Sequence, residues 1–125
     1  MITQKFMLSP TGRNYISAPR RNKRGRISTT YFKDLILIHV LVNGFYEPAN
    51  FKDFVESLNV LQQADQKQMP TRHYVEWKHY SDRAKQQLFD KGLLAGIENG
   101  RVMIPLHNFG AARSAVSCYD EEVTG

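Results

Sequence analysis

The chain has 125 residues and a formal net charge of +5 at pH 7, and this length predicts one domain with a modest apolar core. Its single cysteine, Cys118, excludes an intramolecular disulfide framework and a cysteine-ligated zinc cluster, and suits a reducing compartment. No apolar run reaches the roughly 20 residues of a membrane span, and the first residues lack the apolar core of a secretion signal, so we expect a soluble cytoplasmic protein, or a nuclear one in a eukaryotic host.

The positive charge is concentrated at the N-terminus. Residues 1–26 carry +7 and no acidic side chain, so the rest of the chain sums to −2. Prolines and glycines interrupt this segment, which predicts a basic extended arm over residues 1–27. Ile16 and its apolar neighbours indicate that part of the arm packs on the domain or on a second subunit. The candidate phosphate contacts are Arg20, Arg21, Lys23, Arg24 and Arg26. The alternative is a solubilising tail.

Residues 28–44 predict a central helix. Ser28 is a suitable N-terminal cap, Gly44 follows the last apolar residue, and the segment between them is apolar nearly all round. A buried strand is the alternative, because β-branched residues alternate at Ile36, Ile38, Val40 and Val42. His39 has no second ligand three or four residues away, so we interpret it as a core or half-exposed residue and not as a metal ligand.

An amphipathic helix is predicted over residues 51–64, with Asn50 as its cap. Its apolar residues recur at helical spacing and are Phe51, Phe54, Val55, Leu58 and Leu61. Such a stripe normally faces a core. This helix is also one of two candidate surfaces for a homodimer, and the other is the C-terminal extension at residues 106–125, in which residues 111–116 predict a short helix.

Residues 69–105 predict helix, tight turn, helix and β-hairpin. Pro70 suits the first turn of the first helix. Ser81 is expected to cap a second helix that Gly92 ends, with Ala84 and Leu88 on its packed face. The two strands that follow are joined at Asn99-Gly100, a pair suited to a type I′ turn.

This stretch resembles the winged helix-turn-helix family. The likeness lies in the pattern L-x-x-x-G-L-[LI] at Leu88, Gly92, Leu93 and Leu94, and in a wing tip at Asn99-Gly100-Arg101. It covers about a third of the chain. It implies a mainly α fold with a small β-hairpin over residues 28–105, in which helix 51–64 is an addition to the usual family pattern. It also implies a scaffold that binds nucleic acid, although not one particular function.

Side chains suited to nucleic acid lie on the polar face of the second helix. Gln86 can pair with adenine and Arg83 with guanine in a major groove. Asp82 and Asp90 oppose phosphate on the same helix. The other candidate contacts in this region are Arg72, Lys78, Ser81, Lys85 and Arg101, with the cations expected on phosphates.

No spacing typical of an enzyme is found: there is no glycine-rich phosphate loop, no HExxH, no G-x-S-x-G and no cysteine pair. We therefore expect a protein with no catalytic residues, metal ligands or cofactor. Three hypotheses remain. We favour a small sequence-specific double-stranded DNA-binding regulator, repressor-like and dimeric. The alternatives are an RNA- or ribosome-associated winged-helix protein and a protein-interaction module.

Overall fold

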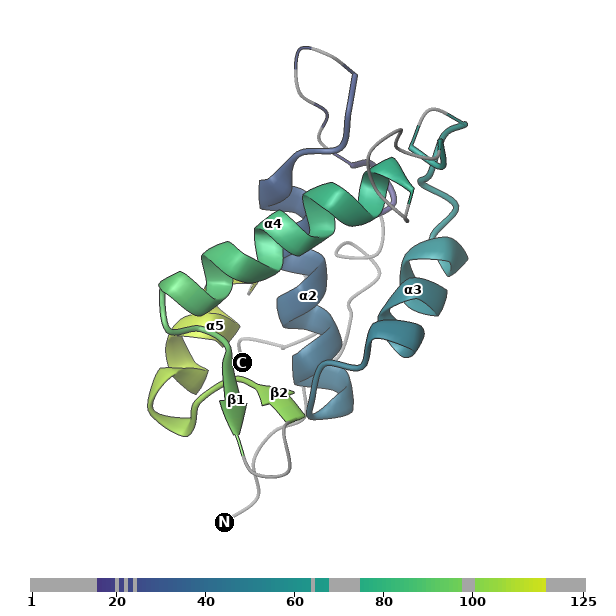
Figure 1. The fold of residues 1–125 in the computed structure, drawn as a ribbon. Helices are drawn as coiled ribbons and strands as arrows, with labels where there is room; N and C mark the ends of the chain where they lie inside the picture. The colour runs from purple at the N-terminus through teal and green to yellow at the C-terminus, as the bar shows by residue number, and fades with distance from the viewer. Residues whose placement is uncertain are drawn as a thin grey trace, which may run out of the picture.

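The computed structural model describes residues 16–19, 21, 23, 25–63, 65–67, 75–97 and 101–116. Helix α2 (Thr29–Asn43) lies in the middle of the fold, and α3 (Pro48–Ser57), α4 (Glu76–Asp90) and α5 (Phe109–Ala115) pack against it (Figure 1). Strands β1 (Ala95–Ile97) and β2 (Arg101–Met103) and the short 3-10 helix η2 (Leu106–Asn108) connect α4 to α5. The mainly helical fold with a small antiparallel sheet is confirmed. Several sequence predictions fall outside the described residues, namely those for Arg20, Arg24, Arg72, Asn99-Gly100 and Cys118.

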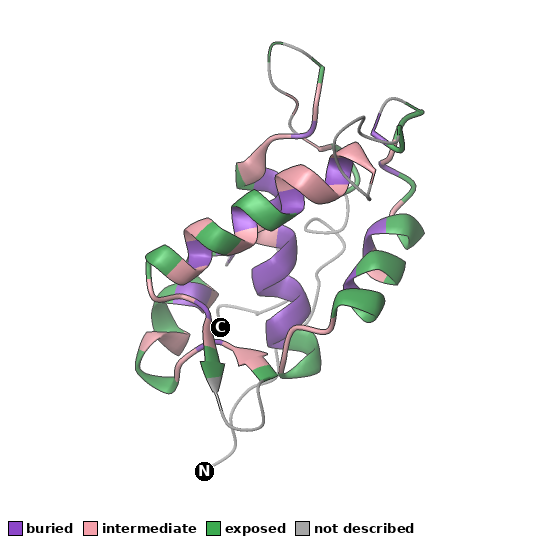
Figure 2. Ribbon diagram, in the orientation of Figure 1, coloured by how far each residue is buried: buried purple, intermediate pink, exposed green. Residues whose placement is uncertain are grey.

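Helix α2 forms as the sequence predicts. The Ser28 hydroxyl accepts a hydrogen bond from the backbone N–H of Tyr31, and Gly44 ends the helix at φ 96°, where its N–H donates to the carbonyl of Val40. The whole run from Leu35 to Leu41 is buried. Figure 2 shows this as a buried helix between partly exposed neighbours. An all-round apolar helix is stable only with packing on several sides. Because residues 29–43 form an α-helix, the strand alternative is wrong.

Helix α3 differs from the prediction at both ends. It begins at Pro48, which suits the first turn because no amide donor is needed there, so Asn50 lies inside the helix and does not cap it. It ends at Ser57 and not at residue 64, because Asn59 takes a left-handed backbone conformation at φ 56°. Phe51 and Val55 are buried, as the apolar stripe predicts.

Helix α4 is one continuous element, so the predicted turn near Ser81 is wrong. The helix starts at Glu76, and the free N–H groups of Glu76 and Trp77 donate to the backbone carbonyls of Lys67 and Asp65. These carbonyls supply the cap that we had assigned to Ser81, which instead lies in mid-helix with 3% of its surface exposed. The segment 69–74, predicted as the start of a separate helix, lies outside the described residues.

The end of α4 and the hairpin agree with the prediction. Gly92 adopts φ 74°, and the backbone N–H groups of Leu93 and Leu94 both donate to the carbonyl of Leu88. Strands β1 and β2 then pair antiparallel in the register Ala95↔Met103, Gly96↔Val102 and Ile97↔Arg101. A further antiparallel bridge joins Tyr46 to Val102, with the Tyr46 N–H donating to Val102 at 2.7 Å.

The two ends of the described chain also belong to the core. Ile16 and Ile27 are each 1% exposed, and the Tyr31 hydroxyl donates to the carbonyl of Ile16. On the C-terminal side, Ala112 and Val116 are buried against α2 through α5, which realises the short helix predicted near residues 111–116. Among the described residues, none of the helices has the length and apolar character that a bilayer span requires.

Candidate nucleic-acid interface

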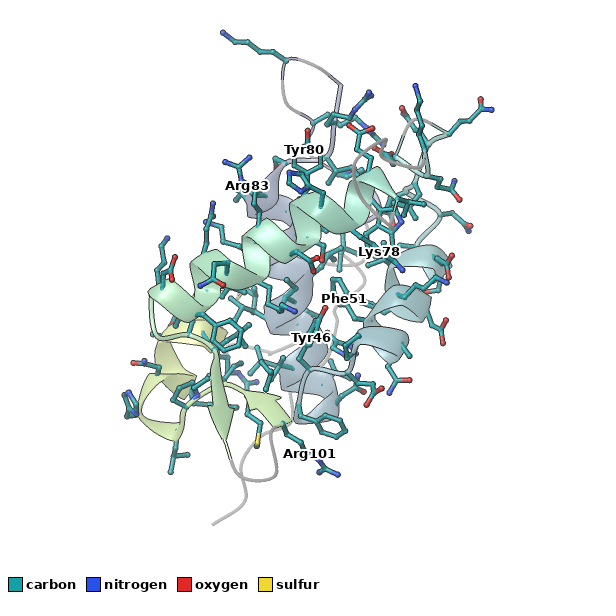
Figure 3. All side chains as sticks on the ribbon, viewed as in Figure 1. Tyr46, Phe51, Lys78, Tyr80, Arg83 and Arg101 are labelled. Atoms are coloured by element: carbon teal, nitrogen blue, oxygen red, sulfur yellow. The ribbon has the colours of Figure 1, made fainter. Side chains whose placement is uncertain are left out.

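Helix α4 has one packed face and one solvent face. Trp77, Ser81, Ala84 and Leu88 recur every three or four residues and are all buried. The Trp77 ring stacks on Phe32 of α2 with centroids 6.0 Å apart. Asp82, Arg83, Gln86 and Asp90 lie on the exposed side, and Arg83 projects away from the core in Figure 3. The polar face expected from the sequence is therefore present.

Two residues expected to read bases lie one turn apart on that exposed face. The Gln86 side-chain amide donates to the Asp90 carboxylate at 3.0 Å, which holds the amide in place and leaves its oxygen and a second N–H available. An adenine edge requires one acceptor and one donor. The carboxylates of Asp82 and Asp90 are exposed on the same face, so they lower the positive potential around Arg83.

Two further cations, one on α4 and one at the start of β2, lie beside aromatic rings. The Lys85 ammonium lies 5.2 Å from the ring centroid of Tyr46, and the Arg101 guanidinium lies 4.5 Å from that of Phe45. Both rings come from the segment between α2 and α3. These cation–π contacts restrict where the two charges lie, and Arg101 stays exposed at the start of β2.

Burial and the neighbouring Asp82 carboxylate raise the pKa of the Tyr46 phenol to about 12. The phenol is therefore neutral at pH 7 and can donate a hydrogen bond. Lys78 lies one helical turn before Asp82 on α4 and is half-buried. It lines a small pocket between α3 and α4.

The N-terminal cations divide into paired and exposed groups. Arg21 donates to both carboxylate oxygens of Asp65, at 3.2 and 3.0 Å, and to the carbonyl of Val60 at 3.0 Å. Arg26 forms an ion pair with Glu76, the first residue of α4. Lys23 is exposed. Two of the five arm residues predicted to contact phosphate thus bind the domain itself.

Ser81 is the predicted contact that the fold removes from the surface. Its position on the core side of α4 prevents its hydroxyl from reaching a groove. Sequence reasoning also missed Phe45 and Tyr46, whose rings hold Arg101 and Lys85. The only signal in the sequence was an aromatic pair directly after Gly44. Its partners lie about 40 and 55 residues further along the chain, and periodic patterns in a short window do not detect contacts at that separation.

Comparison with known proteins adds no identification. No protein-family model, curated protein or solved structure matches the chain.

Proposed function

We propose that this chain is a small sequence-specific DNA-binding protein of winged helix-turn-helix type, acting as a transcriptional regulator. In this proposal α4 enters the major groove and the β1–β2 hairpin is the wing. The observation that carries the proposal is the exposed face of α4, where Arg83 and Gln86 lie on the side away from the core, followed by a hairpin whose second strand begins with the exposed Arg101.

The order of elements supports the proposal with one change from the sequence-based version. Helix α2, the bridge at Tyr46, helix α3, helix α4 and the hairpin follow one another. The last three of these, two helices and a hairpin, are the elements on which the resemblance to a winged helix-turn-helix rests. Helix α3 would then be the first helix of the helix-turn-helix, the role that we had given to the segment before Ser81, and it would not be an addition.

The division of labour among side chains follows from their surroundings. Arg83 and Gln86 are exposed, as base-reading residues must be, and Asp90 orients the Gln86 amide. Lys85 and Arg101 are restrained by aromatic rings, which suits contacts to a phosphate backbone of fixed geometry. Lys23 lies on the N-terminal segment that Arg26 attaches to the start of α4, and it supplies one further cation.

The experiment is a selection from short random-sequence DNA duplexes, followed by fluorescence anisotropy at two salt concentrations. We expect an enriched sequence that binds more tightly than random duplex. Arg83→Ala and Gln86→Ala should each reduce that preference by roughly fivefold or more, since one bidentate base contact is worth about 1–3 kcal/mol. Binding to random duplex should change little and should weaken steeply with salt.

Matched controls are Lys67→Ala and Gln63→Ala, which make comparable changes at exposed positions outside α4. They should keep the preference of the unmodified protein. The proposal fails if both α4 variants retain full sequence preference. Salt-dependent binding to structured RNA with none to duplex DNA would favour the RNA-associated alternative, and the absence of binding to either would favour a protein-interaction module.

A further inference from the structure

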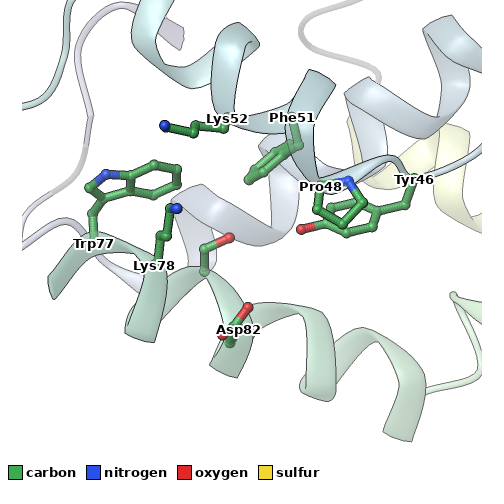
Figure 4. Close-up of a pocket in the computed structure, with 8 residues that line it drawn as sticks. Tyr46, Pro48, Phe51, Lys52, Trp77, Lys78 and Asp82 are labelled. Atoms are coloured by element: carbon green, nitrogen blue, oxygen red, sulfur yellow. The ribbon is translucent and has the colours of Figure 1, made fainter. Parts of the chain in front are cut away.

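A small pocket lies between α3 and α4, next to the face that we assign to duplex DNA. It has a volume of about 150 Å³. Phe51 and Lys52 line it from α3, Trp77, Lys78 and Asp82 from α4, and Tyr46 from the connection before α3. Figure 4 shows the three aromatic side chains around the opening between the two helices. The pocket is part of the fold, because Phe51 and Trp77 are core residues.

The size of the pocket limits what can enter it. A cavity of about 150 Å³ holds a single benzene ring, whereas pockets for larger organic ligands start near 300 Å³. The pocket is open to solvent, so its inner part matches a six-membered ring more closely than a fused purine. The aromatic side chains provide apolar contact to a flat ring.

The two ends of the pocket carry different polar groups: two lysines at one end, and a hydroxyl and a carboxylate at the other. The ammonium groups of Lys52 and Lys78 come from different helices and both lie at the end formed by Trp77 (Figure 4). Within the described part of the chain, neither forms an ion pair. The Tyr46 hydroxyl and the Asp82 carboxylate lie toward the other end. Two cations favour an anionic group at one end, and a donor next to an acceptor favours a polar ring edge at the other.

We propose that this pocket binds a pyrimidine nucleotide, with the ring between α3 and α4 and the phosphate on Lys52 and Lys78. Asp82 can accept from the amino group of cytosine, and the neutral Tyr46 hydroxyl can donate to the ring carbonyl, so cytosine is preferred to uracil. The nucleotide is either free or an unpaired residue of a strand. The site does not depend on α4 entering a duplex.

The test uses the indole N–H signal of Trp77 in NMR spectra of the full chain, because this is the only tryptophan and it lines the pocket. The probes are CMP, UMP, AMP, cytidine and a short single-stranded oligocytidine. We expect saturable shifts with CMP or the oligonucleotide, and affinity for CMP roughly fivefold or more above that for AMP and cytidine. A response to the oligonucleotide alone assigns the pocket to a strand, and a response to CMP assigns it to a free nucleotide.

Lys52→Ala is the decisive variant, since Lys52 is not among the residues proposed to read bases. It should weaken CMP or oligocytidine binding by roughly threefold to tenfold and leave the sequence preference for duplex DNA unchanged. Lys91→Ala, at an exposed lysine just after α4, is the charge-matched control and should have no effect. Equal binding of AMP and CMP, equal binding of cytidine and CMP, or no shift with any probe would overturn the proposal. Loss of duplex specificity in Arg83→Ala with CMP binding retained would show that the two sites are separate.

Discussion

His39 is a buried titratable residue within an aromatic cluster. It is 3% exposed, and its ring lies 5.9, 5.5 and 6.2 Å from the rings of Tyr46, Phe51 and Phe54. Burial lowers the pKa of His39 below 6.5, while a hydrogen bond with the backbone of Glu47 opposes this shift. The His39 imidazole is therefore neutral in the folded protein at pH 7.

The pH dependence of stability follows from this shift. Between the folded pKa of His39 and 6.5, the unfolded chain binds a proton that the folded chain does not, so the free energy of unfolding falls as pH falls through that window and is fully retained above it. We expect His39→Gln to flatten the slope seen in urea unfolding between about pH 5 and pH 7.5. His107→Gln, the same change at an exposed histidine, should keep it. An unchanged slope in His39→Gln would contradict this account.

At the scale of elements, the start of α4 can be tested with two serines. Ser28 caps α2 through its hydroxyl, whereas Ser81 lies inside α4. Ser28→Ala should reduce the free energy of unfolding by about 1 kcal/mol. Ser81→Ala should change it by less than about 0.5 kcal/mol, because alanine is the better residue in mid-helix. Thermal or urea unfolding measures both. A loss in Ser81→Ala equal to that in Ser28→Ala would mean that a helix does begin there.

Elements with their own start and stop residues could be predicted from the sequence. Helix α2 carries a serine cap and a terminal glycine, and the end of α4 at Gly92 is set by a left-handed backbone position. The start of α4 could not be predicted, because its cap is made by backbone carbonyls at Asp65 and Lys67 and backbone carbonyls are common to all residue types. Ser81 was predicted as a cap because its residue type suits that position and the sequence does not show that α4 already begins at Glu76.

In the candidate site, too, local features could be predicted from the sequence and long-range contacts could not. The exposed face of α4 follows from helical periodicity, so Arg83 and Gln86 were correctly predicted to lie opposite Ala84 and Leu88. The partners of Arg21, Lys85 and Arg101 lie 39 to 56 residues away along the chain. Contacts at such separations depend on the tertiary fold, and for this reason the sequence alone predicted that arm cations contact phosphate where Arg21 and Arg26 bind the domain.

For the whole molecule, the contact between Arg21 and Asp65 attaches the N-terminal segment to the helical domain. The Asp65 side chain is 2% exposed and that of Arg21 is 20% exposed. Asp65 also accepts from the backbone N–H of Gln62 at 2.7 Å. Removing one partner of a buried ion pair leaves the other charge and its neighbours unsatisfied, which is strongly destabilising.

We expect Asp65→Ala to lower the free energy of unfolding by about 2–3 kcal/mol, somewhat below the loss for a fully buried pair because Arg21 is partly solvated. Asp53→Ala, at an exposed aspartate of α3, should change it by less than about 0.5 kcal/mol. Urea unfolding gives both values, and adding Arg21→Ala completes a double-mutant cycle. Additive effects of Arg21→Ala and Asp65→Ala would show that the pair is not coupled.

This attachment affects how the basic segment should be studied. Deleting residues 1–26 removes Ile16 from the core and Arg21 and Arg26 from their ion pairs, so lost nucleic-acid binding could reflect unfolding. Lys23→Ala removes charge at an exposed position and leaves these contacts intact. It is therefore the informative substitution.

Helix α2 also has a consequence for biosynthesis. During translation it leaves the ribosome before α4 and α5 exist, although these later helices cover much of its surface. A nascent chain that ends before residue 76 therefore exposes an apolar helix with no polar side of its own, a substrate for chaperones and a starting point for aggregation. C-terminal truncations should be recovered as inclusion bodies even when the intact chain is made in folded form.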